Sequence, residues 1–241
     1  MLRDGADRDQ LIDLIGRSNP TILEVGAHMA DQSVRFAEWF PYGQVFAFEP
    51  DPRPIRNFQS RPGNPRVHMV ECALGNHIGK TTFYQSDGVP PATPEEDIKK
   101  YHPEGWDHSG SIRPPKEHLH EFPWVKFDNT IEVEVTTLDA WSEEVGVKYI
   151  DLIWADVQGA EQDLIAGGRK TLLNTRFFYT EFSEKELYKG ALDASAILKL
   201  LPDFELVEMF KHDMLLRNKR AWDQPVRSPT WRDWLLPNRR A

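Results

Sequence analysis

Hydrophobic and polar positions along the chain predict strands that alternate with helices. Residues 8–17 carry aliphatic side chains at helical spacing, and Pro20 ends that pattern. Residues 21–25 form an apolar run that leads into Gly26, and helical spacing returns from residue 31 to residue 40. A strand, a tight turn and a helix in this order are typical of a parallel sheet.

The same alternation continues through most of the chain. Residues 149–155 are an almost continuous apolar run, as in a central strand that is covered on both faces. Residues 131–137 alternate between apolar and polar side chains, which is typical of a strand with one face in water. Further strands are expected at residues 44–48, 67–72, 81–85, 177–182, 205–210 and 212–216, with the last two as an antiparallel pair, and further helices at residues 52–59 and 194–201. The pattern predicts a parallel α/β sheet.

Residues 86–129 interrupt this pattern, because proline, histidine, glycine and charged residues dominate there and no period is visible. A segment of this length without structure is usually a lid or a binding loop, or else disordered. Its aromatic residues favour the lid. We therefore divide the chain into a leading helix (1–20), a main domain (21–220) that contains this insertion (86–129), and a C-terminal tail (221–241). The tail is a surface wrap, an oligomer contact or a disordered end.

Composition and charge narrow the expected partners. The 241 residues are 40% hydrophobic and 28% charged, which is enough for one sizeable core. The net charge of −9 has the wrong sign for a protein that binds a phosphate backbone, so nucleic acid is not an expected partner. The single cysteine, Cys72, cannot form an internal disulfide, and neither a signal peptide nor a membrane span is visible. We expect a cytoplasmic protein with a small-molecule substrate, which could form a homo-oligomer.

Acidic residues stand at the carboxyl ends of the expected strands, where open α/β sheets bind their ligands. They are Glu24, Glu49 with Asp51, Asp156, Glu181 and, near a fifth strand, Glu71. Gly26 allows the backbone to approach a ligand closely, and the helix that follows offers its amides to an anionic group. An acid at the position of Glu49 can accept hydrogen bonds from both hydroxyls of a ribose. This pattern favours a cofactor that contains ribose and an anionic group.

The turn after Gly26 differs from a dinucleotide-binding motif. His28 and Asp31 stand where that motif has its second and third glycines, which leaves little room for a pyrophosphate. S-adenosylmethionine, which has no phosphate, therefore fits better than NAD. An NAD-dependent oxidoreductase or epimerase stays open as the alternative enzyme. Taken alone, each acid also has a structural explanation: Glu24 could cap a turn or pair with an arginine, and Glu49 could be a solvated loop residue.

Four segments of the chain resemble the FkbM family of methyltransferases. They are LEVGAH (23–28), VFAFEPDP (45–52), VEVTTLD (133–139) and IDLIWADVQGAE (150–161), and Ser109-Gly110-Ser111 in the insertion matches as well. These segments follow the family's order and cover most of residues 20–182. The resemblance implies an S-adenosylmethionine-dependent methyltransferase that acts on oxygen, commonly on a hydroxyl of a sugar or a natural product. Pattern and resemblance together predict an α/β fold with a doubly wound, Rossmann-like, mainly parallel seven-stranded sheet and helices on both faces.

The resemblance also implies residue roles. Glu24, Gly26 and Ala27 would line the methionine end of the cofactor, Glu49 would hold the ribose, and Cys72 with Ala73 would flank the adenine. The full expected cofactor set is Glu24, Gly26, Ala27, His28, Asp31, Ser33, Glu49, Pro50, Cys72, Ala73 and Asp156. Two positions depart from the family: Ala30 replaces a glycine, and Gln158 replaces a glutamate that could act as a base. The second departure raises another alternative, a cofactor-binding protein without catalysis.

Methylation of oxygen requires a hydroxyl that is aligned with the sulfonium methyl group. A sugar hydroxyl is a poor nucleophile, so a base or a metal ion must activate it. Asp156 and Glu181 end neighbouring strands, so both carboxylates should face one crevice and are the expected catalytic residues. Related sugar methyltransferases resemble this layout and hold a magnesium ion between two such acids. Mg²⁺ is therefore a second candidate cofactor, with Asp156 and Glu181 as its ligands.

The insertion supplies the remaining candidates. The spacing of its histidines His102, His108, His118 and His120 matches no standard metal-ligand pattern, which favours solvated loop residues. His108, beside Ser109-Gly110-Ser111, is the third expected catalytic residue. The expected substrate-binding residues are Ser111, Arg113, Lys116 and Gln158. The two cations among them could hold a phosphate or carboxylate of the acceptor.

Overall fold

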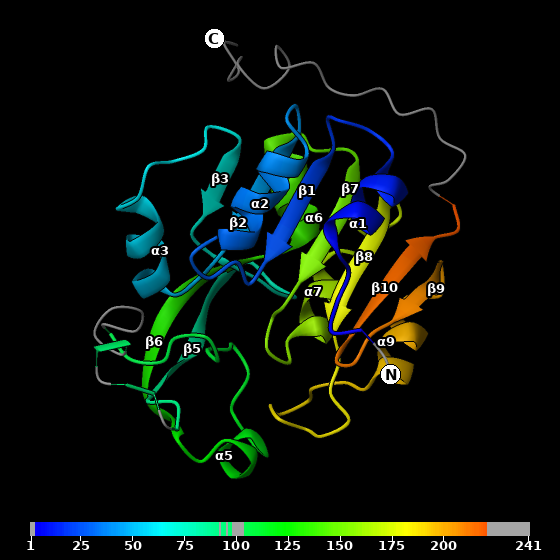
Figure 1. Cartoon of the computed structure of the whole chain (residues 1–241). Helices are drawn as coiled ribbons and strands as arrows, with labels where there is room; N and C mark the ends of the chain where they lie inside the picture. Colours follow the sequence, from blue (N-terminus) through cyan, green and yellow to red (C-terminus); the bar gives the residue numbers. More distant parts are fainter. Residues whose placement is uncertain (1–2, 92, 95, 98–103, 221–241) are drawn as a thin grey trace.

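The computed structural model describes residues 3–91, 93–94, 96–97 and 104–220 (Figure 1). The expected C-terminal tail (221–241) and His102 lie outside these residues. The helices are α1 (Arg8–Ile15), α2 (Asp31–Trp39), α3 (Pro52–Gln59), α5 (His118–Glu121), α6 (Leu138–Val145), α7 (Glu161–Gly167), α8 (Arg169–Leu172) and α9 (Ala194–Leu200). None of the helices in the described part of the chain is long and apolar enough to cross a membrane.

The main sheet of the described residues has seven strands in the order β3-β2-β1-β7-β8-β10-β9. Its strands are β3 (Val67–Val70), β2 (Gln44–Phe48), β1 (Thr21–Val25), β7 (Ile150–Ala155), β8 (Thr175–Glu181), β10 (Asp213–Asn218) and β9 (Phe204–Met209). Neighbouring strands are parallel, except that β10 runs antiparallel to both β8 and β9. The chain order reverses between β1 and β7, which is where a doubly wound sheet opens a crevice for ligands. The predicted fold class is confirmed.

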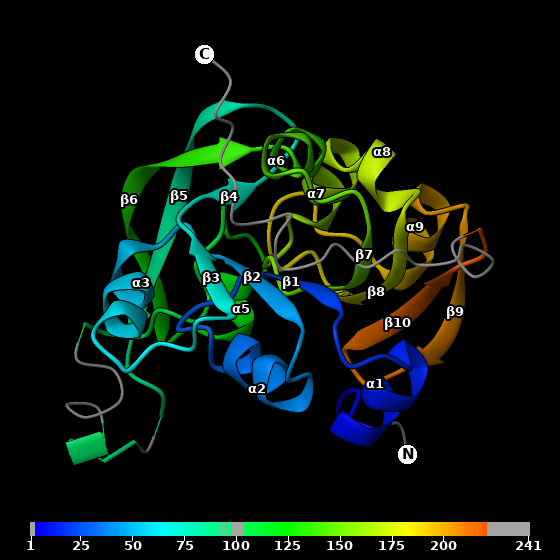
Figure 2. The same cartoon turned by 90° about the horizontal axis from the view of Figure 1, so that it is seen from above.

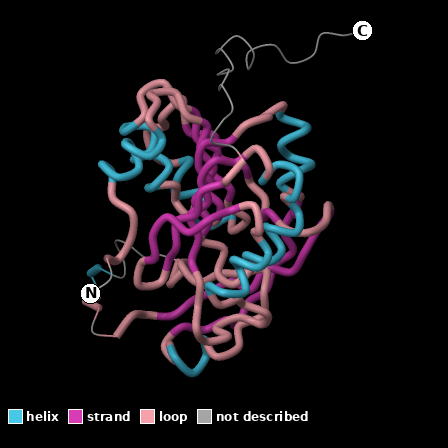
Figure 3. The backbone as a smooth tube through the Cα atoms, turned by 90° about the vertical axis from the view of Figure 1, so that its right-hand side faces the viewer, coloured by secondary structure: helices cyan, strands magenta, loops and turns pink. Residues whose placement is uncertain are grey.

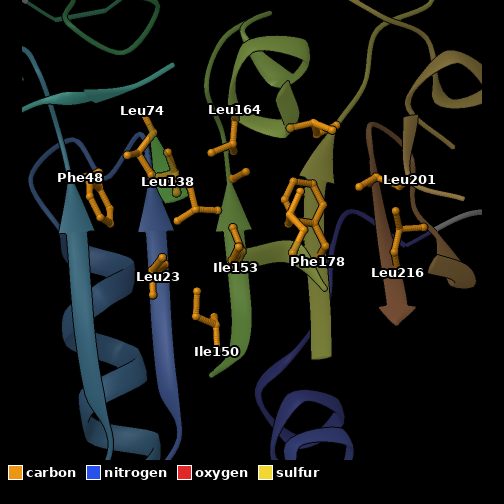
Figure 4. Close-up of a cluster of buried hydrophobic side chains, with 14 of the residues drawn as sticks. Leu23, Phe48, Leu74, Leu138, Ile150, Ile153, Leu164, Phe178, Leu201 and Leu216 are labelled. Carbon is orange, nitrogen blue, oxygen red and sulfur yellow. The ribbon is translucent and has the colours of Figure 1, made fainter. Parts of the chain in front are cut away.

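Helices cover both faces of this sheet, as Figures 2 and 3 show. The helices α6, α7 and α9 pack on one face, where Leu23, Ile153 and Phe178 from three neighbouring strands meet Leu138 and Leu164 (Figure 4). The helices α1 and α2 pack on the opposite face. Because successive side chains of a strand point to opposite faces, a strand covered on both faces must be apolar throughout. The nearly continuous apolar run at residues 149–155 corresponds to such a strand, β7.

A second, three-stranded sheet was not expected from the sequence. It has the order β4-β6-β5, with β4 (Ala73–Leu74), β6 (Val125–Thr136) and β5 (Gly79–Gly88). Strands were expected at residues 81–85 and 131–137, but β5 and β6 are longer and pair as far as Gly88 and Val125. The expectation that residues 86–129 lack regular structure is therefore wrong at both ends of the insertion. Pairing with the partner strand, a long-range contact, orders these polar segments.

The second sheet lies near the carboxyl ends of β1 and β7 (Figure 1). The insertion continues from it, and Ser111 forms an isolated bridge with Tyr84 of β5. Hydrogen bonds then join the insertion to the segment after β8, where the N–H of Lys116 donates to the carbonyl of Leu187 over 2.8 Å. These contacts place the insertion over the carboxyl ends of β1 and β7, where the crevice opens.

Candidate functional site

Backbone geometry brings the ends of β1, β2 and β7 together around Gly26. The N–H of Gly26 donates to the carbonyl of Phe48 over 3.0 Å, and the N–H of Asp156 donates to the carbonyl of Val25 over 2.9 Å. Gly26 has a φ of +83°, and a Cβ atom at this position would lie 1.8 Å from the carbonyl oxygen of Asp156. Glycine is thus required here both by the left-handed backbone and by the close strand contact.

A first cavity, of about 100 Å³, lies at these strand ends. Its lining includes most of the expected cofactor residues, namely Gly26, His28, Glu49, Pro50, Cys72, Ala73 and Asp156. It also includes His108, Ser111 and Gln158, which were expected to act in catalysis or substrate binding. Residues that are distant in the sequence therefore converge on one cavity at the reversal of strand order.

The other expected cofactor residues lie outside the lining of this cavity. Glu24 is buried below it and accepts a hydrogen bond from the hydroxyl of Ser33. Burial raises the pKa of Glu24 to about 8. Ala27 is buried and donates its N–H to the carbonyl of Phe48. Asp31 begins α2 at the surface and pairs with Arg61 over 2.7 Å.

Glu49 is held at the rim of the first cavity by two backbone donors. Its carboxylate accepts the N–H of His28 over 2.8 Å and the N–H of Asp51 over 2.7 Å. Burial raises the pKa of Glu49 to about 7, while these two hydrogen bonds act in the opposite direction. The side chain is therefore fixed in place and able to change its charge near neutral pH.

Asp156 and Glu181 form a buried carboxyl pair, because a hydrogen bond joins their side chains. Burial raises the pKa of both groups. A hydrogen bond from Gln158 Nε2 to Asp156 Oδ1, of 2.6 Å, lowers the pKa of Asp156 again. The neighbouring carboxylates Asp156, Asp213 and Glu161 instead raise the pKa of Glu181 further. A hydrogen bond between two carboxyl groups requires a proton, so the pair carries at least one.

A second cavity, of about 500 Å³, lies beside the first. Gln158 lines both cavities, whereas Asp156 lines the first and Glu181 lines the second. The carboxyl pair therefore spans the boundary between the two cavities. The wall of the second cavity contains the aromatic residues Phe122, Phe182 and Tyr188, the acids Glu121, Glu161, Glu181 and Glu184, and the basic residues Lys185, Lys211 and His212.

Tyr188 and Gln158 connect the insertion to this boundary. The hydroxyl of Tyr188 lies 2.8 Å from the carbonyl oxygen of Ser109 and 2.9 Å from Oε1 of Gln158. Ser111 donates its hydroxyl to the carbonyl of Gln158 over 2.7 Å. Gln158 has a φ of +50°, which is unusual for a residue other than glycine. The insertion thus holds Gln158 in a conformation in which its amide faces Asp156.

Two expected substrate-binding cations are engaged elsewhere. Arg113 donates to both carboxylate oxygens of Asp163 over 2.6 and 2.7 Å, and Lys116 pairs with Glu186. Neither cation is among the lining residues of the two cavities. The sequence did not indicate that Asp107 and Tyr188 would join the site, although both line a cavity there.

Comparison with known proteins gives one profile match and two relatives. A sequence profile of the methyltransferase FkbM domain matches residues 24–214, a range that includes every residue lining the two cavities. The chain is 45% identical over 216 residues to the 2-O-methyltransferase NoeI of Sinorhizobium fredii (strain NBRC 101917 / NGR234), which covers 88% of this chain and 84% of that protein. It is 27% identical over 167 residues to methyltransferase sdnD of Sordaria araneosa, which covers 62% of this chain and 61% of that protein.

Among solved structures, the chain is similar to methyltransferase FkbM from Methylobacillus flagellatus KT. That match has a TM-score of 0.48 and 13% sequence identity, and it covers 83% of this chain. This chain spans 44% of the length of that protein chain.

Proposed function

We propose, because this chain belongs to the FkbM family of methyltransferases, that it transfers the methyl group of S-adenosylmethionine to a hydroxyl oxygen of a sugar or a glycoside. Family membership confirms the resemblance in the sequence and makes the chain a methyltransferase. The observation that carries the finer proposal is the Asp156–Glu181 carboxyl pair, which lies between two adjoining cavities. One cavity would take the cofactor and the other the acceptor.

The first cavity offers the groups that S-adenosylmethionine requires. The carboxylate of Glu49 stands at the end of β2, where it can accept hydrogen bonds from the ribose hydroxyls. Cys72 and Ala73 would contact the adenine. In the turn after β1, His28, with a φ of +49°, and Asp31 stand in place of the second and third glycines that make room for a pyrophosphate. This turn supports S-adenosylmethionine over NAD.

The second cavity suits a polyhydroxylated ring. Phe122, Phe182 and Tyr188 provide apolar faces for the carbon skeleton of a sugar. Glu161 and Glu181 provide oxygen atoms that pair with hydroxyl groups. The relative NoeI is named a 2-O-methyltransferase, which supports oxygen as the atom that receives the methyl group. We propose a sugar residue as the acceptor for these reasons.

Asp156 is the proposed general base. S-adenosylmethionine, when bound, supplies an electrophilic methyl group next to the acceptor oxygen. The carboxylate of Asp156 takes the proton of the acceptor hydroxyl as the new carbon–oxygen bond forms. Glu181 keeps its own proton and donates a hydrogen bond to Asp156, so the pair carries one negative charge before the reaction. Gln158 orients Asp156 by donating from its amide nitrogen over 2.6 Å.

The residues around this pair do not fit a magnesium site. Magnesium binds oxygen atoms, whereas Gln158 presents its amide N–H to Asp156. Among the described residues, no third His, Cys, Asp or Glu joins Asp156 and Glu181 in a group with metal-ligand spacing. We therefore assign the activation of the hydroxyl to Asp156 alone.

A transfer assay tests the proposal. The protein is incubated with S-adenosylmethionine labelled in its methyl group and with a panel of free sugars and alkyl glycosides. We expect S-adenosylhomocysteine and a labelled methyl ether on one sugar, with no product from the analogue that lacks that hydroxyl. Tight cofactor binding without transfer to any hydroxylated acceptor would instead identify a binding protein, and tighter binding of NAD would identify an oxidoreductase or epimerase.

The affinity for the cofactor should depend on pH through Glu49. In the cofactor-free protein the pKa of Glu49 is about 7. A decrease from pH 8 to pH 6 therefore protonates this carboxylate and removes its attraction for the cationic cofactor. We expect the dissociation constant to rise about tenfold over that range, because the ionised fraction falls by about this factor. Isothermal titration calorimetry of the wild type and of Glu49→Gln measures the effect. The variant should show a shallower dependence, and equal wild-type affinity at both pH values would contradict the role of Glu49.

A further inference from the structure

Three side chains of metal-ligating type meet where the insertion covers the turn after β1. His28 belongs to that turn, and Asp107 and His108 belong to the insertion. Each residue offers one ligand atom, and these three atoms all lie within 4.8 Å of one another. All three residues line the first cavity. They form a cluster that is separate from the Asp156–Glu181 pair.

The distances within the cluster are close to those of a metal site. Nε2 of His28 lies 2.8 Å from Oδ1 of Asp107, and Nε2 of His108 lies 3.8 Å from the same oxygen. Imidazole and carboxylate ligands stand about 2.0–2.2 Å from a zinc ion, which places neighbouring ligand atoms about 3–4 Å apart. The separations of 2.8 and 3.8 Å in the cluster are close to this range.

Nε2 of His28 is buried and faces Oδ1 of Asp107 at 2.8 Å. The rings of His28 and His108 are tilted by 36° to each other with centroids 3.9 Å apart, so both imidazoles lie beside Asp107. Imidazole nitrogens and a carboxylate oxygen are ligands that zinc and similar ions bind in proteins.

Neighbouring groups hold the cluster in place. The ring of Trp106 packs against His108 with centroids 4.7 Å apart, and its Nε1 donates to the hydroxyl of Ser109 over 3.0 Å. The backbone N–H of His28 donates to Glu49, which fixes the other side of the cluster. Such surrounding contacts orient the ligands of metal sites in proteins.

We propose that His28, Asp107 and His108 bind a divalent transition-metal ion such as zinc, and that this ion fastens the insertion over the turn after β1. Two imidazoles and one carboxylate suit zinc and similar ions, whereas magnesium prefers oxygen ligands. Three protein ligands leave further coordination positions for water or for a bound molecule in the first cavity. Binding of the ion does not require the proposed methyl transfer.

Calorimetric titration of chelator-treated full-length protein with Zn²⁺, in the absence of cofactor, tests the proposal. We expect one site per chain whose affinity falls at least tenfold in His28→Asn and in His108→Ala. Asparagine is chosen at residue 28 because it tolerates the left-handed backbone there. His120→Ala is the matched control, since His120 is an exposed histidine of the same insertion outside the cluster.

The outcomes separate this site from adventitious binding. Retention of affinity in His120→Ala together with its loss in the two cluster variants supports the proposal, as does failure of Mg²⁺ to compete. Absence of a zinc site in the wild type overturns it. Equal zinc affinity in the wild type, His28→Asn and His108→Ala also overturns it. Circular dichroism of each variant confirms that the folded proteins are compared.

Discussion

Asp156→Asn should lower the rate of methyl transfer by about 100- to 10,000-fold at saturating cofactor and acceptor, the usual contribution of a general base. The amide is similar in size to the carboxylate and keeps the side chain in the first cavity, but it cannot take the acceptor's proton. Cofactor affinity should change far less than the rate. Single-turnover kinetics with labelled S-adenosylmethionine, combined with calorimetry, separates these two effects.

Glu181→Gln is the matched variant for this prediction. An amide at residue 181 retains an N–H that can donate to Asp156, as the protonated Glu181 does. We therefore expect a loss of less than about tenfold in rate, the size of a change between two neutral donors. A large loss in Glu181→Gln together with a small loss in Asp156→Asn would show that the two acids have the opposite roles.

Glu49→Ala should weaken the binding of S-adenosylmethionine by about 10- to 100-fold, which is the scale of charge-assisted hydrogen bonds to the ribose. The variant also leaves the N–H groups of His28 and Asp51 without their acceptor at the rim of the first cavity. Calorimetry gives the affinity, and thermal unfolding shows whether the fold is retained. Glu71→Ala removes an exposed acid after β3 and serves as the control. Unchanged cofactor affinity in Glu49→Ala would contradict its assignment.

Local patterns predicted the main sheet well, because its strands are short apolar runs that end at turns. The expected ranges 21–25, 44–48 and 52–59 coincide with β1, β2 and α3. The same patterns placed Glu49 and Asp156 at strand ends, and parallel strand order then brings such residues to one edge of the sheet. Adjacency of β7 and β8 accounts in the same way for the pairing of Asp156 with Glu181.

Contacts that depend on distant segments could not be predicted from local pattern. Arg113 and Lys116 were expected to bind an acceptor anion, but each meets an acid 50 and 70 positions further along the chain. The spacing of the insertion's histidines gave no indication of the cluster of His28, Asp107 and His108, because His28 comes from the turn after β1. Pairing of β5 with β6 and the contacts of Tyr188 fix where the insertion lies.

The most direct test of the proposed function is a crystal structure with S-adenosylhomocysteine and the methyl acceptor bound together. We predict the cofactor product in the first cavity with its ribose on Glu49. The acceptor ring should lie in the second cavity against Phe182 and Tyr188, with its reactive hydroxyl within hydrogen-bonding distance of Asp156. An acceptor bound away from the Asp156–Glu181 boundary, or a reactive oxygen facing neither carboxyl group, would contradict the proposed mechanism.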